Sequence, residues 1–193
     1  KAPDLQPIAL RFDTVMSNNE QIAVTWTGRN NGADFDGNFY DAIHLSRTPD
    51  LSGYLRTLHR QYQSQTLPTN TTYEAQTNIK VPDDLHGDYY LIYVIDDGNR
   101  VYEMDFEGNN LLAKPIRIQH ADLSLEMASA PSSAVAGQAV QIEWSSRNIG
   151  QGSILNKTLK DEIFLSSDDD FNLSGDRKIG ELATPISLQQ NEP

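Results

Sequence analysis

Apolar and polar residues alternate along most of the chain in short runs. Residues 21–29 place Ile22, Val24 and Trp26 on one side of an extended backbone and mainly polar residues on the other. Strict alternation over this length is typical of a strand with one buried face. Comparable runs occur at residues 40–46, 55–63, 72–81, 89–95 and 111–119. The pattern predicts a β protein with almost no helix.

Some of these runs indicate where a strand lies in its sheet. Residues 89–95 are aromatic or β-branched at nearly every position, which predicts a central strand. Pro7 and Pro115 cannot donate to a ladder and therefore predict edge positions for the first and last strands. After the turn at 96–99, we expect a return strand to begin at Val101–Glu103. About seven strands with regular turn signals predict a β-sandwich.

A nine-residue stretch occurs twice. Val24–Gly32 has a near copy at Ile142–Gly150, and the two copies contain both tryptophans of the chain, each followed at the same spacing by Arg, Asn and Gly. The sequence therefore predicts a tandem repeat of immunoglobulin-like β-sandwiches. Residues 1–119 form a complete sandwich in this interpretation, and residues 120–193 form the N-terminal part of a second one.

The second repeat is predicted to be incomplete in this chain. Its last residues align with residues near 70 of the first repeat, so counterparts of residues 73–118 are missing. A partial sandwich leaves part of its core face uncovered. We expect further residues of a longer parent protein, or strands from another chain, to cover that face.

Composition narrows the classes of partner. The chain has 15 Lys and Arg against 27 Asp and Glu, for a net charge of −12, and no basic cluster, so a nucleic acid partner is not expected. No stretch approaches the 18 apolar residues of a membrane span. Cysteine is absent, which excludes disulfides and thiolate chemistry. The expected partners are other protein domains or neighbouring copies of the same repeat.

No motif of the sequence predicts catalysis. The histidines lack metal-ligand spacing, and the serines lack the Gly-x-Ser-x-Gly context of a hydrolase nucleophile. Trp26 and Trp144 fall on the apolar faces of their strands, so we interpret both as structural core residues. The four histidines are His44, His59, His86 and His120.

Calcium is the one cofactor for which the sequence offers candidates. Oxygen-bearing side chains stand at alternate positions in the acidic turn 167–176, which suits the oxygen ligands that Ca²⁺ prefers. Leu173 and Ile179 occupy the places of the EF-hand glycine and glutamate, so the turn is not an EF-hand. A solvated acidic turn is the alternative interpretation. The candidate ligands are Asp168, Asp170, Asn172 and Asp176, with Ser174 between the last two.

A second acidic group surrounds the final hairpin of the first repeat. Turn formation and local hydrogen bonding explain most of these residues, and calcium is the other interpretation. The group comprises Asp96, Asp97, Glu103, Asp105, Glu107, Asn109 and Asn110.

Several of these residues together resemble the CARDB family, the cell-adhesion-related domain found in bacteria. The resemblance spans the first repeat and continues into the second through Asp122-Leu123, Trp144, Asn148, Gly150, Asp161 and Leu165-Ser166. It implies an immunoglobulin-like module used in tandem on surface or secreted proteins, and it specifies no ligand. The matching residues of the first repeat are Pro3-Asp4-Leu5, Trp26, Asn30, Gly32, Asp41, Leu45-Ser46, Tyr89-Tyr90-Leu91, Asp96, Asn99, Val101, Glu103 and Asn109-Asn110.

These observations predict a non-catalytic module of a large bacterial protein, located outside the cell or on its surface. Its expected role is that of a stalk, an adhesive unit or a structural repeat. Two alternatives remain open at this point. The chain could be an accessory domain of a secreted protease or glycoside hydrolase, or a filament subunit completed by strands from a neighbouring chain.

Overall fold

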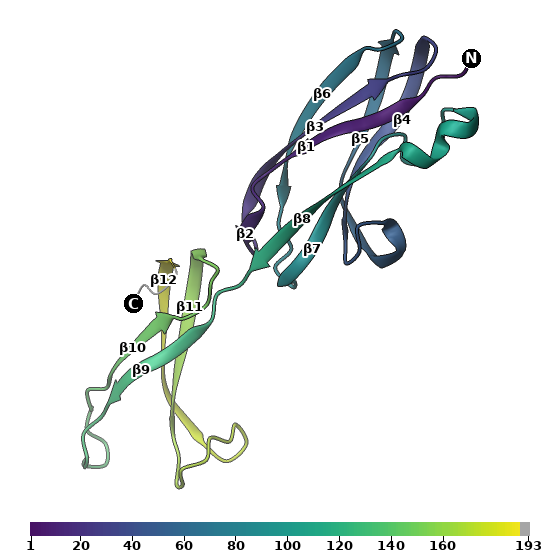
Figure 1. Cartoon of the computed structure of the whole chain (residues 1–193). Helices are drawn as coiled ribbons and strands as arrows, with labels where there is room; N and C mark the ends of the chain where they lie inside the picture. Colours follow the sequence, from purple (N-terminus) through teal and green to yellow (C-terminus); the bar gives the residue numbers. More distant parts are fainter. Residues whose placement is uncertain (190–193) are drawn as a thin grey trace. The chain divides into compact units, whose positions relative to one another are not determined.

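The chain forms two compact units, Lys1–His120 and Ala121–Pro193, in a computed structural model that describes residues 1–189 (Figure 1). We call them unit 1 and unit 2 and describe each by itself. Within residues 1–189, neither of the helices has the length and hydropathy that a bilayer crossing requires.

Unit 1 is a sandwich of two sheets (Figure 1). The three-stranded sheet has the order β1 (Leu5–Arg11), β3 (Gln21–Asn30), β6 (Thr72–Lys80). The five-stranded sheet has the order β2 (Val15–Ser17), β8 (Leu111–Gln119), β7 (Gly87–Val94), β4 (Phe35–Ser46), β5 (Tyr54–Leu67). Neighbouring strands are antiparallel except β2 and β8, which are parallel. The predicted all-β immunoglobulin-like sandwich is confirmed.

The core lies between the two sheets of unit 1. Trp26 of β3 is fully buried and faces apolar side chains of β4 and β7, among them Ile43 and Leu91. The aromatic run at 89–95 forms most of β7, which lies between β8 and β4 as a central strand, as predicted. β1 is an edge strand, and its register shifts between Pro7 and Ala9, as expected for a strand that contains proline.

Three details of unit 1 differ from the expectation. The edge position predicted for the last strand from Pro115 is wrong for the strand as a whole, because β8 lies between β2 and β7; Pro115 is compatible with this place because β2 pairs only with Arg117–Gln119. The unit has eight strands rather than about seven, because residues 15–17 form the short strand β2. The prediction of a return strand at Val101–Glu103 is wrong. These residues form no strand, and the chain continues into the 3₁₀ helix η2 (Met104–Asn109). The reason is that the Asp96 carboxylate accepts hydrogen bonds from the backbone N–H groups of Arg100 and Val101. Side chains thereby satisfy backbone groups that a ladder would otherwise bind.

Unit 2 contains two antiparallel pairs of strands in its described residues. β9 (Leu123–Ser129) pairs with β10 (Glu143–Asn148), and β11 (Ile154–Leu165) pairs with β12 (Arg177–Leu188). Trp144 is only partly buried, whereas Trp26 of unit 1 is fully buried. Trp144 lines a hollow of about 500 Å³ together with apolar side chains of β11 and β12.

One asparagine anchors the first strand of each unit. The buried side chain of Asn30 accepts hydrogen bonds from the N–H groups of Asp4 and Gly32, and it donates to the carbonyl oxygens of Ala33 and Leu67. A β-carbon at Gly32 would lie 2.4 Å from the Ala2 carbonyl oxygen, so this position requires glycine.

The same arrangement recurs in unit 2. Asn148 accepts from the N–H groups of Asp122 and Gly150 and donates to the carbonyl oxygens of Gly152 and Gln189. The Asn-x-Gly part of the repeated stretch therefore forms a structural joint. It holds the start of unit 1 to the end of β3 and the start of unit 2 to the end of β10.

Replacing Asn30 with Ala should lower the free energy of unfolding of unit 1 by about 2–4 kcal/mol, because two partly buried N–H groups and two carbonyl groups lose their partner. Urea unfolding followed by Trp26 fluorescence, in a Trp144→Phe background, measures the change. Asn38→Ala, at an exposed position of β4, is the matched control. A loss for Asn30→Ala no larger than the control would contradict the assignment.

Candidate functional site

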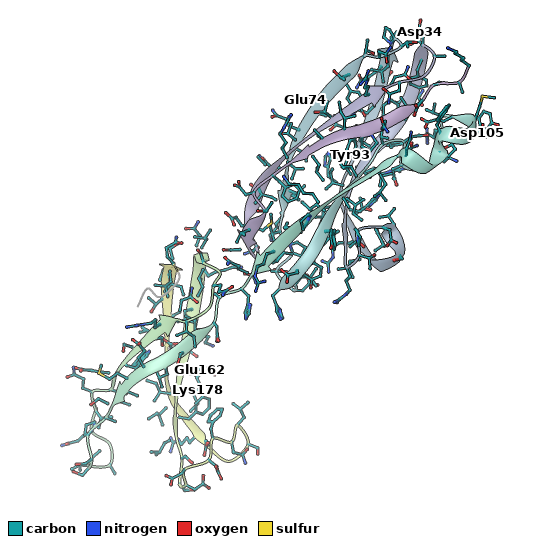
Figure 2. All side chains as sticks on the ribbon, viewed as in Figure 1. Asp34, Glu74, Tyr93, Asp105, Glu162 and Lys178 are labelled. Carbon is teal, nitrogen blue, oxygen red and sulfur yellow. The ribbon has the colours of Figure 1, made fainter. Side chains whose placement is uncertain are left out.

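A carboxylate is buried at the centre of unit 1. Asp41 of β4 is 1% exposed, and its two oxygens accept hydrogen bonds from both sheets. Tyr93 comes from β7 of the same sheet and points between the sheets (Figure 2). The donors are Trp26 Nε1 at 2.8 Å, Gln63 Nε2 at 2.8 Å, the Tyr73 hydroxyl at 2.8 Å and the Tyr93 hydroxyl at 3.1 Å.

Burial and hydrogen bonding act in opposite directions on Asp41. Removal from water raises the pKa of its carboxyl group, and the hydrogen bonds from Trp26, Tyr73 and the other donors partly lower it. The same burial, together with the nearby negative charge, raises the pKa of the Tyr73 and Tyr93 hydroxyl groups. The tyrosines therefore remain protonated and able to donate. This geometry holds the two sheets together and exposes no group to a substrate.

Unit 2 repeats the central contact of this cluster. Trp144 Nε1 donates to Asp161 Oδ2 at 2.9 Å, as Trp26 donates to Asp41. In the sequence, Asp41 and Asp161 are recognisable only as residues of the CARDB pattern, and their bonds to tryptophan were not predicted. The available signal was the recurrence of Trp and Asp in both repeats.

Asp41→Ala should destabilise unit 1 by about 3–5 kcal/mol, because the change leaves buried indole, amide and hydroxyl donors without an acceptor. The measurement is urea unfolding followed by Trp26 fluorescence in the Trp144→Phe background. Asp36→Ala removes an exposed carboxylate from the same strand and serves as the control. Equal effects of the two substitutions would show that Asp41 does not hold the sheets together.

The acidic group around the final hairpin is also organised by local hydrogen bonds. Glu103 is fully buried, and its Oε1 accepts from the backbone N–H of Leu5 at 3.0 Å. With its amide oriented to donate, Asn110 bonds to Glu103 Oε2 and to the carbonyl oxygen of Leu5. Glu107 accepts from the backbone N–H of Glu103. These residues fasten η2 to the start of β1.

Glu103 titrates near neutrality. Burial, with smaller contributions from the negative charges of Glu107 and Asp96, raises the pKa of Glu103 to about 7 from an ordinary value of 4.5. Between these two pH values the folded state binds more protons than the unfolded state. Stability therefore falls as pH rises through this range, and the loss is complete above about pH 7.

Glu103→Gln should remove this part of the pH dependence, since glutamine keeps an acceptor for Leu5 N–H and carries no charge. We expect the variant to match the unaltered chain near pH 4.5 and to exceed its stability by about 3 kcal/mol at pH 8. Urea unfolding from pH 4.5 to 8 measures the difference. Asp105→Asn makes the same change of charge at an exposed position of η2 (Figure 2), and a pH-dependent gain of similar size there would refute the assignment to Glu103.

The candidate calcium residues lie in the exposed turn between β11 and β12. Asp168 accepts from the N–H of Asp170, and Asn172 accepts from the N–H and hydroxyl of Ser174. Asp176 accepts from the N–H of Asn172. Unit 1 contains the same turn at Asp50, whose carboxylate accepts from the N–H and hydroxyl of Ser52.

The hydrogen bonds of the turn show how its side-chain oxygens are used, which bears on whether they fit a calcium ion. Within residues 1–189, no three His, Cys, Asp or Glu side chains converge in a group that could hold a metal. Side chains of the turn point to its own backbone, as expected of a solvated acidic turn. Calcium at Asp168, Asp170, Asn172 and Asp176 stays a prediction, which calorimetric titration of EDTA-stripped protein with CaCl₂ would decide.

The structure brings some histidines into contacts that their spacing did not predict. His44 is buried on β4, with Nδ1 2.9 Å from the Thr57 hydroxyl and Nε2 3.3 Å from Asp97 Oδ1. Burial lowers the pKa of His44, and Asp97 partly offsets this effect. Tyr54 packs against the His44 ring and contacts the same threonine hydroxyl, so the group links β4, β5 and the turn after β7.

The other three histidines make ring contacts, His59 at a half-buried position and His86 and His120 at exposed ones. His59 lies beside Trp26, with ring centroids 5.8 Å apart. His86 and His120 pack against each other at 4.7 Å.

The two sheets, their strand order and the buried tryptophan between them define unit 1 as an immunoglobulin-like β-sandwich. The family model of CARDB matches residues 2–114, and the chain belongs to this family. CARDB is a non-catalytic domain family. No curated relative matches the chain.

Similar solved structures include two of a CARDB domain. The CARDB domain of the PF1109 protein from Pyrococcus furiosus, crystallised in complex with di-metal ions, is 15% identical, with a TM-score of 0.46 over 61% of this chain and 90% of that chain. Its solution NMR structure is 17% identical, with a TM-score of 0.45 over 61% of this chain and 96% of that chain.

A β-glucosidase from Erythrobacter marinus is also similar. It is 13% identical, with a TM-score of 0.41 over 60% of this chain. The matched part is only 15% of the β-glucosidase chain.

Proposed function

We propose that this chain is a non-catalytic structural module of a bacterial extracellular or cell-surface protein, where consecutive units act as a load-bearing stalk or adhesive repeat. Membership of the CARDB family supports this function. The repeated Trp-Asp and Asn contacts of units 1 and 2 also support it, because an array requires units that fold on one plan.

The observation that carries the proposal is the parallel pairing of β2 with β8. Arg117 N–H donates to the Thr14 carbonyl oxygen, and Asn18 N–H donates to the Gln119 carbonyl oxygen, both at 2.8 Å. β2 lies near the start of unit 1 and β8 ends it. β1 precedes β2 and pairs with β3, so a pull on the two ends of the unit loads that pairing first and then moves β2 and β8 in opposite directions along a common axis.

This arrangement loads the hydrogen bonds between β2 and β8 in shear. All bonds of a sheared pair carry the load together, whereas a pair pulled apart from one end loses its bonds one at a time. Resistance to force depends on the unfolding barrier rather than on equilibrium stability alone. The pairing thus suits a unit that transmits tension.

Asn18→Pro tests the load-bearing role. The change removes the N–H that donates to Gln119, and proline suits the second position of the turn 17–20, in which Asn19 has a φ of 64°. We expect a lower unfolding force for unit 1 in atomic force microscopy, with an equilibrium loss of only about 1 kcal/mol. Full unfolding should release on the order of 400 Å of chain.

Asn18→Ala is the control, because it keeps the backbone donor and loses only the side-chain bond to Asp83. Equal unfolding forces for Asn18→Pro and the unaltered chain would refute the mechanical role.

Antibody labelling tests the location. Antibodies raised against the chain should label intact cells of the source organism as strongly as permeabilised cells, or should detect the protein in the culture medium. Labelling that requires permeabilisation would contradict an extracellular function.

A further inference from the structure

Four strands form the edges of the two sheets of unit 1, and three of them are protected against pairing with another chain. β1 contains Pro7 and an irregular register, and β2 is only three residues long. β6 carries Glu74 and Lys80, which leave an uncharged run of only five residues between them. Proline, bulges, short length and charge are the usual means by which natural proteins block an exposed edge.

The fourth strand, β5, is protected over its first half only. Its N-terminal half contains Arg56 and Arg60, and its register with β4 shifts twice there. Residues 61–67 pair with β4 in regular register and contain no charge and no proline. We call this stretch, Gln61–Leu67, the open edge.

The backbone of the open edge has unused hydrogen-bonding groups. Within residues 1–189, no hydrogen bond outside the β4 ladder involves a backbone group of residues 61–66. The strand is extended, and its outward side chains Tyr62, Ser64 and Thr66 are exposed and uncharged. A strand with such an edge is a template for one more antiparallel strand.

The corresponding strand of unit 2 differs at the same place. β12 contains Pro185, and Lys178 and Glu181 lie nearer its start. Lys178 also bonds to Glu162 on the neighbouring strand (Figure 2). The repeat therefore offers an internal comparison, in which proline interrupts the second half of the strand in unit 2 and no proline or charge interrupts it in unit 1.

We propose that the open edge of unit 1 binds the open edge of a second copy of this chain, antiparallel and about a two-fold axis at Ser64. This axis pairs the uncharged segment with itself, with Gln61 opposite Leu67 and Tyr62 opposite Thr66 of the second copy. The two five-stranded sheets join into one, and no buried charge results. Closed two-fold pairing of this kind is the commonest form of self-association. It does not depend on the proposed stalk function.

A cysteine at Ser64 tests the register directly, because the chain has no other cysteine. Residues directly opposite in an antiparallel pair have Cα atoms about 4.5–5.5 Å apart, within the reach of a disulfide. Ser64→Cys should form a disulfide-linked dimer under mild oxidation much faster than Asn38→Cys. Asn38 lies opposite Ser64 on β4 of the same copy, so two copies of position 38 are three strand spacings apart, about 14 Å.

Charge reversal supplies a second test. The unaltered full chain should show concentration-dependent dimerisation in analytical ultracentrifugation. Ser64→Lys and Ser64→Glu should each raise the dimer dissociation constant by about tenfold or more, since like charges would face each other at the axis. An equimolar mixture of the two variants should restore dimers, and Asn38→Lys should have little effect.

Three results would overturn the inference. The first is a chain that stays monomeric up to millimolar concentration. The second is Ser64→Cys forming a disulfide no faster than Asn38→Cys. The third is dimerisation that Ser64→Lys leaves unchanged, which would place the contact on another surface. Circular dichroism melting curves of each variant verify that the sandwich remains folded.

Discussion

The buried carboxylate of Asp41 is the group on which the packing of unit 1 depends. An unpaired charge between two sheets would cost several kcal/mol, and here donors from both sheets compensate it. Trp26 and Tyr73 bring the three-stranded sheet to Asp41, while Gln63 and Tyr93 belong to the same sheet as the carboxylate. The Tyr73 ring passes over Gly28, where a β-carbon would lie 2.5 Å from a ring atom. Hydrophobic burial holds the layers together, and Asp41 selects the one alignment in which its donors meet.

The local patterns of the sequence predicted the strands whose side chains alternate between core and solvent. β3 and β7 were predicted in this way, and Pro7 indicated the irregular edge strand β1. The hydrophobic pattern could not predict Asp41 as a core residue, since a carboxylate in a strand normally indicates the solvent face. The pattern also failed at Val101–Glu103, where it predicted a strand that the structure does not contain. The backbone groups of this segment are bound by side chains of residues several positions away, and alternation carries no information about such bonds.

The contacts that matter for assembly are also non-local. The parallel pairing of β2 with β8 joins residues about 100 positions apart, and three residues are too few to give a periodic signal. The open edge of β5 is visible only when strand order is known, because an uncharged strand at the centre of a sheet has no free edge. Comparison of the two repeats does reveal it in part, since β12 has a proline in the segment where β5 has none. Differences between copies of a repeat thus point to functions that the common pattern hides.

The donors of Asp41 lie at increasing distances along the chain. Trp26, Gln63, Tyr73 and Tyr93 are 15, 22, 32 and 52 residues away from it. A chain that collapses before β7 has joined the sheet would enclose a carboxylate that lacks part of its hydrogen bonding, so partly assembled forms are penalised. Tyr93 is the most distant of these donors along the chain. We therefore expect β7 to join the sheet before water leaves the core around Asp41. Unit 1 is thus expected to fold in a single cooperative step, at the slow rate typical of proteins whose contacts are long-range.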